Sequence, residues 1–484
     1  MAIALFESSL SLLVVPKAKP RYNPAAHSLN SFRGEDVMTK SGLLAGCFIL
    51  LSGSALRAGD AENRQLYTLI KANGRVVVQA EAIRKHFSGK QLADGSAVAA
   101  YGGDFVWAVQ SEQKPSISID DGQPSEMRSL PNSLWVHAAR LASGRSHAHH
   151  YRVEGRILGD KRFDTAAYLD DSYPQAGVPQ GKLSEQLVCE SQVYRGWKIS
   201  YWIYASSGVD PNTPAPAMVW QDGHRFVFPG NHARLLTVVE NLVQQKKIPP
   251  MVLVLIAPGY IGDFDNSEYV PNNDVRRMRS ILYDTVNDDY NKMVLGEIFP
   301  QVEKRYKLRS DGYSRAIGGQ SSGGICSLNA AWWRPEAFGR VLSRIGSFTA
   351  LQWRRGQANP NRSHGLDDPA DVLDGGYIFP FLVRARDRKN IRVWLDDGSN
   401  DLENRAGSWP LQNIQLANSL KMKEYDFYLS FGNHQHSTEH GDAELPKAMT
   451  WLWRGYDSSK TGQDFIIDDE EKAKPYFRVG IVNR

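Results

Sequence analysis

The stretch AIGGQSSGGICSLNAAWW, residues 316–333, decides how the rest of this 484-residue chain is interpreted. It passes from small apolar residues through two adjacent serines, Ser321 and Ser322, into a helical pattern. Glycines flank the serines, and residues 319–323 fit the pattern G-x-S-x-G. A nucleophile on a tight strand-to-helix turn needs neighbours without bulky side chains, because such a turn is strained and closely packed. The pattern selects Ser321 as a candidate nucleophile, and an ordinary flexible loop is the alternative.

Apolar runs alternate with helical segments on both sides of this turn, from about residue 196 onward. The strand-like runs are KISYWIYA, APAMVWQDG, MVLVLIAPG, SRAIGGQ, RVLSRIG, IRVWLDDG and YDFYLSFG. The helical segments include HARLLTVVENLVQQ, DYNKMVLGEIFPQVEKRY, LQNIQLANSLKM and ELPKAMTWLWRGY. Near-continuous apolar strands separated by helices predict a mostly parallel sheet that is covered on both faces. We therefore expect a doubly wound α/β domain over residues 196–456 and a C-terminal tail over residues 457–484.

A nucleophilic serine needs a base, and the base needs a carboxylate that orients it. In a site of this kind both follow the serine, in the order Ser, acid, His, each on a loop after a strand. The run IRVWL leads into DDGSNDLEN, and YDFYLSFG leads into NHQHSTEHG. The candidate acids are Asp396, Asp397, Asp401 and Glu403, and the candidate histidines are His434, His436 and His440. A catalytic acid must reach across to the histidine loop, which favours Asp401. For Asp396 and Asp397 the alternative to a catalytic role is capping of the turn.

Residues 62–160 contain short runs of alternating apolar and polar residues. These runs are GDFVWAVQS, PSISIDDG, SLWVHAARL and HHYRVEGRI, and Gly, Pro, Asp and Ser separate them. Such spacing predicts a small N-terminal β-sandwich of the immunoglobulin-like or E-set kind. Residues 161–195 are rich in Pro and Gly and are expected to form a linker.

Residues 1–61 are expected to be a leader. Within it, residues 38–58 combine a short basic start, an apolar run and small residues near Ala58, a pattern typical of a secretory signal peptide. This pattern favours Met38 as the true start. The apolar run is short for a membrane span, and Cys47 lies inside the run instead of after it, unlike a lipoprotein cysteine. We expect a secreted or periplasmic protein with no membrane span in the mature chain.

The composition, 42% hydrophobic and 10% aromatic, indicates a well-packed globular protein. The formal net charge is +4, and residues 1–58, with six basic and three acidic side chains, contribute +3 of it, which leaves +1. With no basic tract, a nucleic-acid partner is not expected. Only Cys189 and Cys326 remain after the leader, too few for a disulfide scaffold, and Cys326 is expected to be a buried thiol.

From about residue 215 to 456, the chain resembles the enterochelin esterase-like branch of the α/β-hydrolase superfamily, which is related to esterase D and the feruloyl esterases. The resemblance rests on MVWQDGHRF, KKIPPMVLVLIAPG, RSILYDTVNDDY, AIGGQSSGGICSLNAAWWRPEAFGRVLSRIGSF, WLDDGSNDLEN and HSTEHGDAELPKAMTWLWR. It implies an α/β-hydrolase fold with a Ser-Asp-His triad. The family's serine falls on Ser321, the aspartate of GSND on Asp401 and the histidine of H-x-x-x-H-G on His436. His440 then corresponds to a second, structural histidine. The N-terminal β-sandwich also resembles the domain that precedes the hydrolase in these esterases.

Two positions depart from the family pattern. Leu282 replaces a glutamate that often precedes the tyrosine in RS-x-EYDT, so that an Arg–Glu contact of Arg279 is expected to be lost. Gln320 replaces the usual small residue of GASSGG and is expected to narrow the site. Trp353, after the next strand, is a second candidate for the substrate pocket, whereas Trp332 and Trp333 are expected to pack in the core.

The residue types imply the chemistry of an ester hydrolase. Ser321 attacks the ester carbonyl, His436 moves the proton and Asp401 holds the imidazole. The backbone N–H of Ser322, with that of Gly223 or His224 from the QDGH loop, is expected to hold the oxyanion.

We therefore predict a secreted serine carboxyl-ester hydrolase that acts through an acyl-enzyme. Its substrates are small-molecule or glycan-linked esters: feruloyl or acetyl, siderophore-type or simple ones. The nearly neutral mature chain favours carbohydrate-linked or simple esters. An acyltransferase on the same fold and a non-catalytic glycan-binding protein are the alternatives. No cofactor or metal is expected, because His147 and His149, which share a strand face, have no matching cluster and are expected to be surface residues.

Overall fold

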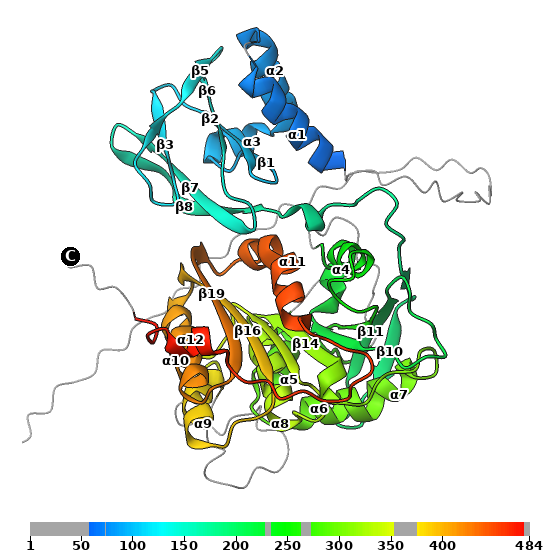
Figure 1. The fold of residues 1–484 in the computed structure, drawn as a ribbon. Coiled ribbons are helices and arrows are strands. Elements are labelled where there is room, and N and C mark those ends of the chain that lie inside the picture. Colours follow the sequence, from blue (N-terminus) through cyan, green and yellow to red (C-terminus); the bar gives the residue numbers. More distant parts are fainter. Residues whose placement is uncertain (1–57, 73, 228–233, 263–272, 353–374, 479–484) are drawn as a thin grey trace, which may run out of the picture. The chain divides into compact units, whose positions relative to one another are not determined.

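The computed structural model describes residues 58–72, 74–227, 234–262, 273–352 and 375–478 (Figure 1). Residues 38–57 of the expected signal peptide, with Met38, lie outside the described residues, and so does Trp353. Within the part of the chain that is described, no helix is both long and apolar enough to cross a membrane.

A nine-stranded mixed sheet forms the centre of the C-terminal domain (Figure 1). Its order is β10-β11-β13-β12-β14-β15-β16-β19, with β9 paired to β11. The strands are β9 (Lys182–Leu183), β10 (Leu187–Glu190), β11 (Lys198–Ala205), β12 (Ala217–Gln221), β13 (Val252–Ile256), β14 (Arg315–Gln320), β15 (Arg340–Arg344), β16 (Arg392–Asn400) and β19 (Asp426–Gln435). From β13 to β19 the neighbours are parallel, and only the β9, β10 and β11 pairings are antiparallel. The predicted mostly parallel sheet is therefore present, but it begins at Lys182, inside the segment expected to be a linker.

The strands bury both of their faces, which explains why their sequences are continuously apolar. In β13, Val252, Val254 and Ile256 belong to one hydrophobic core, and Leu253 and Leu255 belong to the other. Side chains of α4 (Leu235–Gln244) and α11 (Glu439–Trp453) fill the second core. The first core is covered by α5 (Asn273–Asp284), α6 (Asp289–Met293), α7 (Phe299–Val302), α8 (Ser322–Trp333), α9 (Phe379–Ala385) and α10 (Trp409–Met422).

The order of the strands reverses between β12 and β14. The chain adds β13 on one side of β12 and then returns to place β14 on the other side. In open α/β sheets, ligands bind outside the carboxyl ends of the strands at such a reversal. The loop after β12 carries QDGH and the turn after β14 carries the two serines, so this topology brings both segments to one edge of the sheet.

Residues 58–94 form three helices, although strands were predicted from residue 62. The helices are α1 (Ala58–Lys71), α2 (Val76–His86) and α3 (Gly89–Asp94). Their buried residues follow the helical period: Leu66 and Ile70 in α1, then Ala80, Ile83 and Phe87 in and after α2. The alternation that marks strands begins only further along the chain, so the strand prediction was wrong for this segment.

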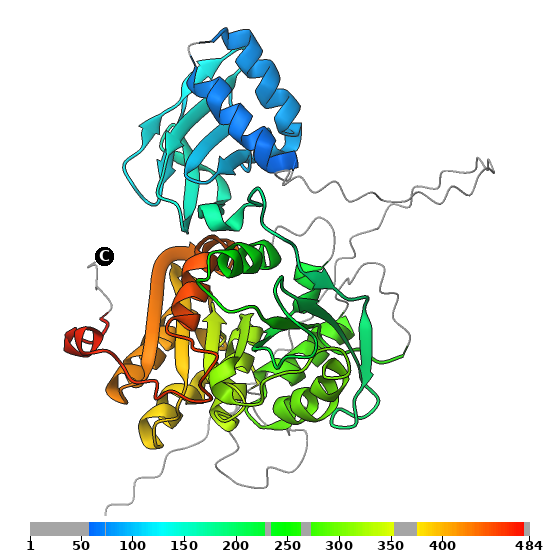
Figure 2. The same ribbon diagram turned by 45° about the vertical axis from the view of Figure 1, so that its right-hand side comes forward.

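Residues 98–167 form two four-stranded antiparallel sheets, ordered β1-β2-β6-β5 and β4-β3-β7-β8. The strands are β1 (Val98–Tyr101), β2 (Asp104–Gln110), β3 (Pro115–Ile119), β4 (Ser125–Glu126), β5 (Arg128–Leu130), β6 (Leu134–Arg140), β7 (Arg145–Val153) and β8 (Arg156–Ala167). On β2, Phe105 and Trp107 pack in a cluster with residues of the second sheet, whereas Val106 and Ala108 pack against the helices. Figure 2 shows the blue helices α1 and α2 side by side against the cyan strands. Strand β8 extends to Ala167, beyond the boundary expected at residue 160.

The two histidines expected on a strand surface are buried instead. His147 is 5% and His149 is 1% exposed. The Nδ1 atom of His147 lies 2.6 Å from Asp120 Oδ2, and Nε2 of His149 lies 3.1 Å from the carbonyl oxygen of Gly95. Burial lowers the pKa of His149 to about 4. Among the described residues, no group of three or more His, Cys, Asp or Glu side chains is placed to hold a metal ion.

Helix α8 ends with Trp332 and Trp333, which were both expected in the core. Trp332 is buried, but Trp333 is 41% exposed, and its Nε1–H donates to Asn329 Oδ1 at 3.1 Å. Consecutive residues on a helix point about 100° apart, so the end of α8 buries only one of them. Cys326 on the same helix is fully buried, as predicted, and both Cys326 and Cys189 are free thiols.

The segment after residue 457 also packs on the C-terminal domain. Phe465 and Ile467 are buried, and Ile466 forms an isolated bridge with Tyr425. A short helix, α12 (Asp469–Ala473), follows.

Asp284, the last residue of α5, is a buried carboxyl group. It is 2% exposed and accepts a hydrogen bond from Ser280 Oγ at 2.7 Å. Burial raises the pKa of Asp284 to about 6, although Ser280 and Arg279 oppose this shift. The folded chain therefore keeps the proton on Asp284 up to a higher pH than the unfolded chain does.

We expect Asp284→Asn to make the stability less dependent on pH. The stability associated with a neutral Asp284 is fully present below the unfolded-state pKa near 3.8 and is lost as the pH rises through about 6. Relative to the variant, the wild type should lose roughly 3 kcal/mol of unfolding free energy between about pH 4 and pH 8. Urea unfolding over this range measures the difference, with the exposed Asp170→Asn as the control. A difference between wild type and Asp284→Asn that stays constant with pH would contradict the prediction.

Candidate active site

Ser321 occupies a strained backbone position between β14 and α8. Its φ is 56° and its ψ is −120°, a region that residues other than glycine rarely adopt. The Ser321 N–H donates to the carbonyl of Arg344 at 2.8 Å, and the Ser321 carbonyl accepts from the Ser347 N–H at 3.1 Å. These bonds to the end of β15 and the loop after it hold the turn, so that the hydroxyl is presented at the carboxyl end of the sheet.

The glycines around Ser321 are closely packed, and the packing excludes a side chain at Gly319. A Cβ atom on Gly319 would lie 2.5 Å from Gln221 Oε1 and 2.6 Å from the carbonyl oxygen of Gly323. A Cβ atom on Gly323 would lie 3.1 Å from the Gln221 side chain and 3.8 Å from Asp222 Oδ2. The start of α8 therefore lies directly against the loop that follows β12.

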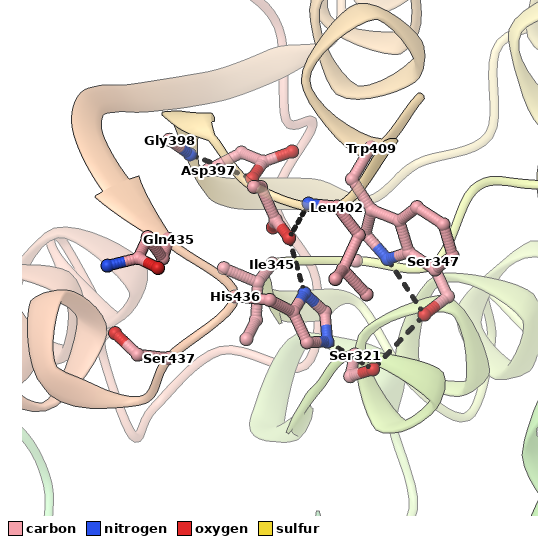
Figure 3. Close-up of polar contacts among 12 residues, drawn as sticks. Ser321, Ile345, Ser347, Asp397, Gly398, Leu402, Trp409, Gln435, His436 and Ser437 are labelled. Atoms are coloured by element: carbon pink, nitrogen blue, oxygen red, sulfur yellow. Dashed lines mark hydrogen bonds and ion pairs between the residues drawn. The ribbon is translucent and has the colours of Figure 1, made fainter. Parts of the chain in front are cut away.

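The structure brings Ser321, His436 and Asp401 into one hydrogen-bonded chain (Figure 3). The Nε2 atom of His436 lies 2.9 Å from Ser321 Oγ, and Nδ1 lies 2.6 Å from Asp401 Oδ1. His436 is in the loop between β19 and α11, and Asp401 is in the turn after β16. The Asp401 side chain is fully buried, and its Oδ1 also accepts the Leu402 N–H at 2.5 Å. An ionised carboxylate only accepts hydrogen bonds, so the Nδ1 of His436 carries the proton and Nε2 faces the serine hydroxyl.

The loop that carries His436 is held from both sides. Asp164 on β8 accepts a hydrogen bond from the Gln435 N–H at 2.8 Å and another from Ser437 Oγ at 3.2 Å. Trp409 packs edge-on to the imidazole, with 5.8 Å between the ring centroids. These contacts fix the position of the imidazole ring.

The other two candidate histidines are not part of the Ser321–His436–Asp401 hydrogen-bonded series. His434 and His440 stack on each other, with 4.1 Å between the ring centroids, and both are buried. Burial lowers the pKa of His440 to about 4, and His440 Nδ1 accepts the Ser146 N–H at 3.4 Å. The structure places neither ring next to Ser321.

Asp396 and Asp397, the competing acids, are buried next to Asp401. Asp397 accepts hydrogen bonds from the Gly398 N–H at 2.7 Å and from Asn413 Nδ2 at 2.6 Å. Burial raises the pKa of Asp397 well above its usual range, and Asp401 raises it further. Two neighbouring buried carboxyl groups do not ionise together easily, which explains why Asp401 opposes ionisation of Asp397. Glu403, the fourth candidate acid, is exposed on the short strand β17 (Glu403–Asn404).

Two further side chains, which could not be identified from the sequence, extend the hydrogen-bonded chain beyond Ser321. The Oγ of Ser347 lies 3.2 Å from Ser321 Oγ, and Trp409 Nε1 donates to Ser347 Oγ at 3.1 Å (Figure 3). Ser347 follows β15, the strand next to β14, and Trp409 is the first residue of α10. Only the position of Ser347 after the neighbouring parallel strand could have indicated the contact.

The loop after β12 carries the residues expected to help hold an oxyanion. Asp222 has a φ of 55°, and Gly223 and His224 begin a short 3₁₀ turn, η2 (Gly223–Phe226). A Cβ atom on Gly223 would lie 2.5 Å from the backbone nitrogen of Ile256, so only glycine fits against β13. Burial lowers the pKa of His224 to about 4, which keeps this imidazole neutral. The N–H of Ser322 is in the first turn of α8, where amides lack acceptors within the helix.

Arg279 has a partner that was not expected from the sequence. It forms an ion pair with Asp222, with Nη2 at 2.6 Å from Oδ2 and Nε at 2.9 Å from Oδ1. Burial opposes ionisation of Asp222, but Arg279 overrides this effect and holds the pKa of that carboxyl below its usual value. Leu282, which stands where the family often has glutamate, is buried in the core. Arg279 therefore has an acidic partner in Asp222, although Leu282 cannot provide one.

The structure describes one of the two predicted pocket residues. Gln320 is half-buried next to Ser321, and its carbonyl oxygen lies 3.4 Å from Arg279 Nη2. The Oε1 atom of Gln320 is buried and has no hydrogen-bond partner among the described residues. Trp353 lies outside the described residues.

Several solved structures are similar to this chain. An enterobactin esterase from Shigella flexneri, solved in the presence of 2,3-di-hydroxy-N-benzoyl-glycine, is 17% identical. The match covers 73% of this chain and 94% of that one, with a TM-score of 0.48. A ferulic acid esterase from the anaerobic fungus Anaeromyces mucronatus is 16% identical over 59% of this chain and 95% of its own, with a TM-score of 0.40.

A curated relative is an endo-1,4-beta-xylanase/feruloyl esterase from Xylanibacter ruminicola, 28% identical over 102 residues. These residues make up 21% of this chain and 12% of the relative, so the chain spans only a small part of that protein's length. A family model described as "Putative esterase" matches residues 193–450, which is more than half of the 484 residues. This match confirms the esterase family expected from the sequence: the chain belongs to the putative esterase family.

Proposed function

We propose that this chain is a serine carboxyl-ester hydrolase that acts through an acyl-enzyme. Ser321 is the nucleophile, His436 is the general base and acid, and Asp401 is the carboxylate that orients the imidazole. The observation that carries the proposal is the hydrogen-bonded chain, with 2.9 Å from Ser321 Oγ to Nε2 and 2.6 Å from Nδ1 to Asp401. Membership of an esterase family supports the same reaction class.

The reaction follows from this geometry. Attack of Ser321 Oγ on the ester carbonyl transfers the hydroxyl proton to His436 Nε2 and forms a tetrahedral oxyanion. His436 gives that proton to the leaving alcohol as the C–O bond breaks, and the acyl group stays on Ser321. Water then attacks the acyl-enzyme and loses a proton to His436, which returns it to Ser321 Oγ as the acid leaves. Asp401 accepts the Nδ1–H throughout and stabilises the imidazolium.

We assign the oxyanion site to the backbone N–H of Ser322 and that of Gly223 or His224. The tight contact between Gly323 and the Gln221–Asp222 segment supports this assignment, because it brings the two loops together. The ion pair of Arg279 with Asp222 holds the second loop. Backbone donors fixed in advance stabilise the developing charge without reorganisation.

For the substrate, we favour carbohydrate-linked feruloyl or acetyl esters over siderophore-type lactones, with simple esters as model substrates. The relative named for xylanase and feruloyl esterase activity supports this order. Of the net charge of +4, residues 1–58 contribute +3, so the rest of the chain offers little attraction for an anionic ferric siderophore. The sequence of residues 38–58 supports a secreted or periplasmic location.

Substitution of the three residues tests the mechanism. Ser321→Ala and His436→Ala should lower kcat on p-nitrophenyl acetate by roughly 10³- to 10⁶-fold, and Asp401→Asn by roughly 10³- to 10⁴-fold. Ser200→Ala, which removes a buried hydroxyl on β11, is the matched control and should keep kcat within about twofold. If Ser321→Ala hydrolysed the ester at the wild-type rate, the proposed function would be wrong.

A substrate panel tests the substrate class. We expect kcat/KM for methyl ferulate and for acetylated xylan to exceed that for a cyclic catecholate lactone by about tenfold or more. Product analysis with added alcohols separates hydrolysis from acyl transfer. A preference for the lactone, or acylated alcohol as the main product, would exclude this assignment.

Loss of the Arg279–Asp222 ion pair should impair the oxyanion loop. In Arg279→Met the buried Asp222 loses its partner, so the unfolding free energy should fall by about 3–5 kcal/mol. The double variant Arg279→Met/Asp222→Asn removes both charges and should recover most of that stability. Its kcat should nevertheless remain about tenfold lower, with KM within about twofold, because the loop is no longer held. Wild-type kcat in this stable double variant would show that the ion pair does not position the loop.

A further inference from the structure

Ser321 Oγ has two hydrogen-bond partners, and the mechanism above uses only His436. The second partner is Ser347, whose Oγ lies 3.2 Å away on the other side of the nucleophile (Figure 3). Ser347 is fully buried, and its N–H donates to the carbonyl of Ser321 at 3.1 Å. The side chain is therefore fixed to the same turn that carries the nucleophile.

A series of hydrogen bonds runs from Trp409 through Ser347, Ser321 and His436 to Asp401. The groups at its two ends determine the direction of every hydrogen bond in it. Trp409 Nε1–H only donates, so Ser347 Oγ accepts from it at 3.1 Å. At the other end the Asp401 carboxylate only accepts, so His436 Nδ1 carries a proton and Nε2 accepts from Ser321. The one hydroxyl proton of Ser321 thus points at His436. The proton between the two serine oxygens must then belong to Ser347.

We propose that Ser347 is a further catalytic residue, whose hydroxyl, oriented by Trp409, donates a hydrogen bond to Ser321 Oγ and stabilises the charge that develops there. This inference rests on the proposed function. When the Ser321 proton moves to His436, the Ser347 O–H already points at the oxygen that gains negative charge, so no reorganisation is needed. The same donor faces Ser321 Oγ when it becomes the leaving group of the acyl-enzyme. Ser347 therefore assists both acylation and deacylation, and no proton leaves it in either step.

The first test is Ser347→Ala with p-nitrophenyl acetate. Removal of one donor to a transition-state charge typically lowers kcat by 10²- to 10³-fold. The Ser347 contact, at 3.2 Å, is long, so we expect a loss of about 10- to 100-fold in kcat, with KM within about twofold. The rate at which a fluorophosphonate labels Ser321 should fall by a similar factor, because this rate reports attack by Ser321 without the deacylation step. Ser343→Ala is the matched control: Ser343 is also a fully buried serine, on β15, but its hydroxyl has no hydrogen-bond partner among the described residues.

A double-mutant cycle with Trp409→Phe separates this role from simple packing. Trp409→Phe keeps a ring beside His436 but removes the donor to Ser347, and it should lower kcat by about 3- to 10-fold. In the Ser347→Ala background the same change should have no further effect on kcat, because Trp409 acts through Ser347. If the two losses in kcat multiply, Trp409 acts independently of Ser347, and the proposed orientation of Ser347 by Trp409 is wrong.

The outcomes distinguish this inference from the proposed function. If Ser321→Ala abolishes hydrolysis but Ser347→Ala keeps kcat and labelling within twofold of wild type, only the role of Ser347 is overturned. If Ser321→Ala is fully active, the proposed function fails first. If Ser347→Ala does not fold, Ser347→Cys is the second variant, because its thiol has a similar shape to the hydroxyl but is a weaker hydrogen-bond donor. A loss of kcat in Ser347→Cys then supports the inference, and wild-type kcat overturns it.

Discussion

The backbone conformation of Ser321 is the constraint on which the whole site depends. A non-glycine residue in such a region costs on the order of 1–3 kcal/mol and persists only where its surroundings hold it. Here the carbonyl of Arg344 and the N–H of Ser347 provide that hold, at 2.8 Å and 3.1 Å. Both belong to the end of β15 and its loop, so the neighbouring strand, and not the glycine-rich turn alone, fixes where the Ser321 hydroxyl points.

The site is assembled because five parallel strands end at the same edge of the sheet. The loops after β12, β14, β15, β16 and β19 supply one element each. They are, in that order, Asp222–His224, Ser321, Ser347, Asp401 and His436. No two of these segments are close in the sequence, yet the parallel pairing of β14 with β15 and of β16 with β19 aligns their ends. A shift in the register of one strand would therefore change several contacts of Ser321 at once.

The sequence predicted what depends on order along the chain and missed what depends on packing. Ser321, Asp401 and His436 could be selected because each follows an apolar run in the order that a strand-turn-helix nucleophile requires. The contact of Ser347 with Ser321 and that of Trp409 with Ser347 could not be predicted, because they depend on the register between strands and on where α10 begins. The partner of Arg279 was missed for the same reason: Asp222 lies 57 residues away in the sequence.

The errors in the N-terminal domain and in α8 have a different cause. Leu66 and Ile70 follow a helical period within a segment whose neighbours alternate as strands do, so the strand pattern was extended too far. Trp333 was placed in the core because of its residue type, although the helix turns it away from the core that buries Trp332.

Asp401 is one of several buried acids near the end of β16. Arg344 pairs with Asp442 at 2.8 Å and faces Asp396 at 3.7 Å, and burial raises the pKa of Asp396 to about 7. Burial likewise raises the pKa of Asp397, and Asp401 raises it further. Among these carboxyl groups, only Asp401 contacts the imidazole. Burial therefore favours the neutral forms of the neighbouring acids, whereas Asp401 is the one of the three that faces the ring.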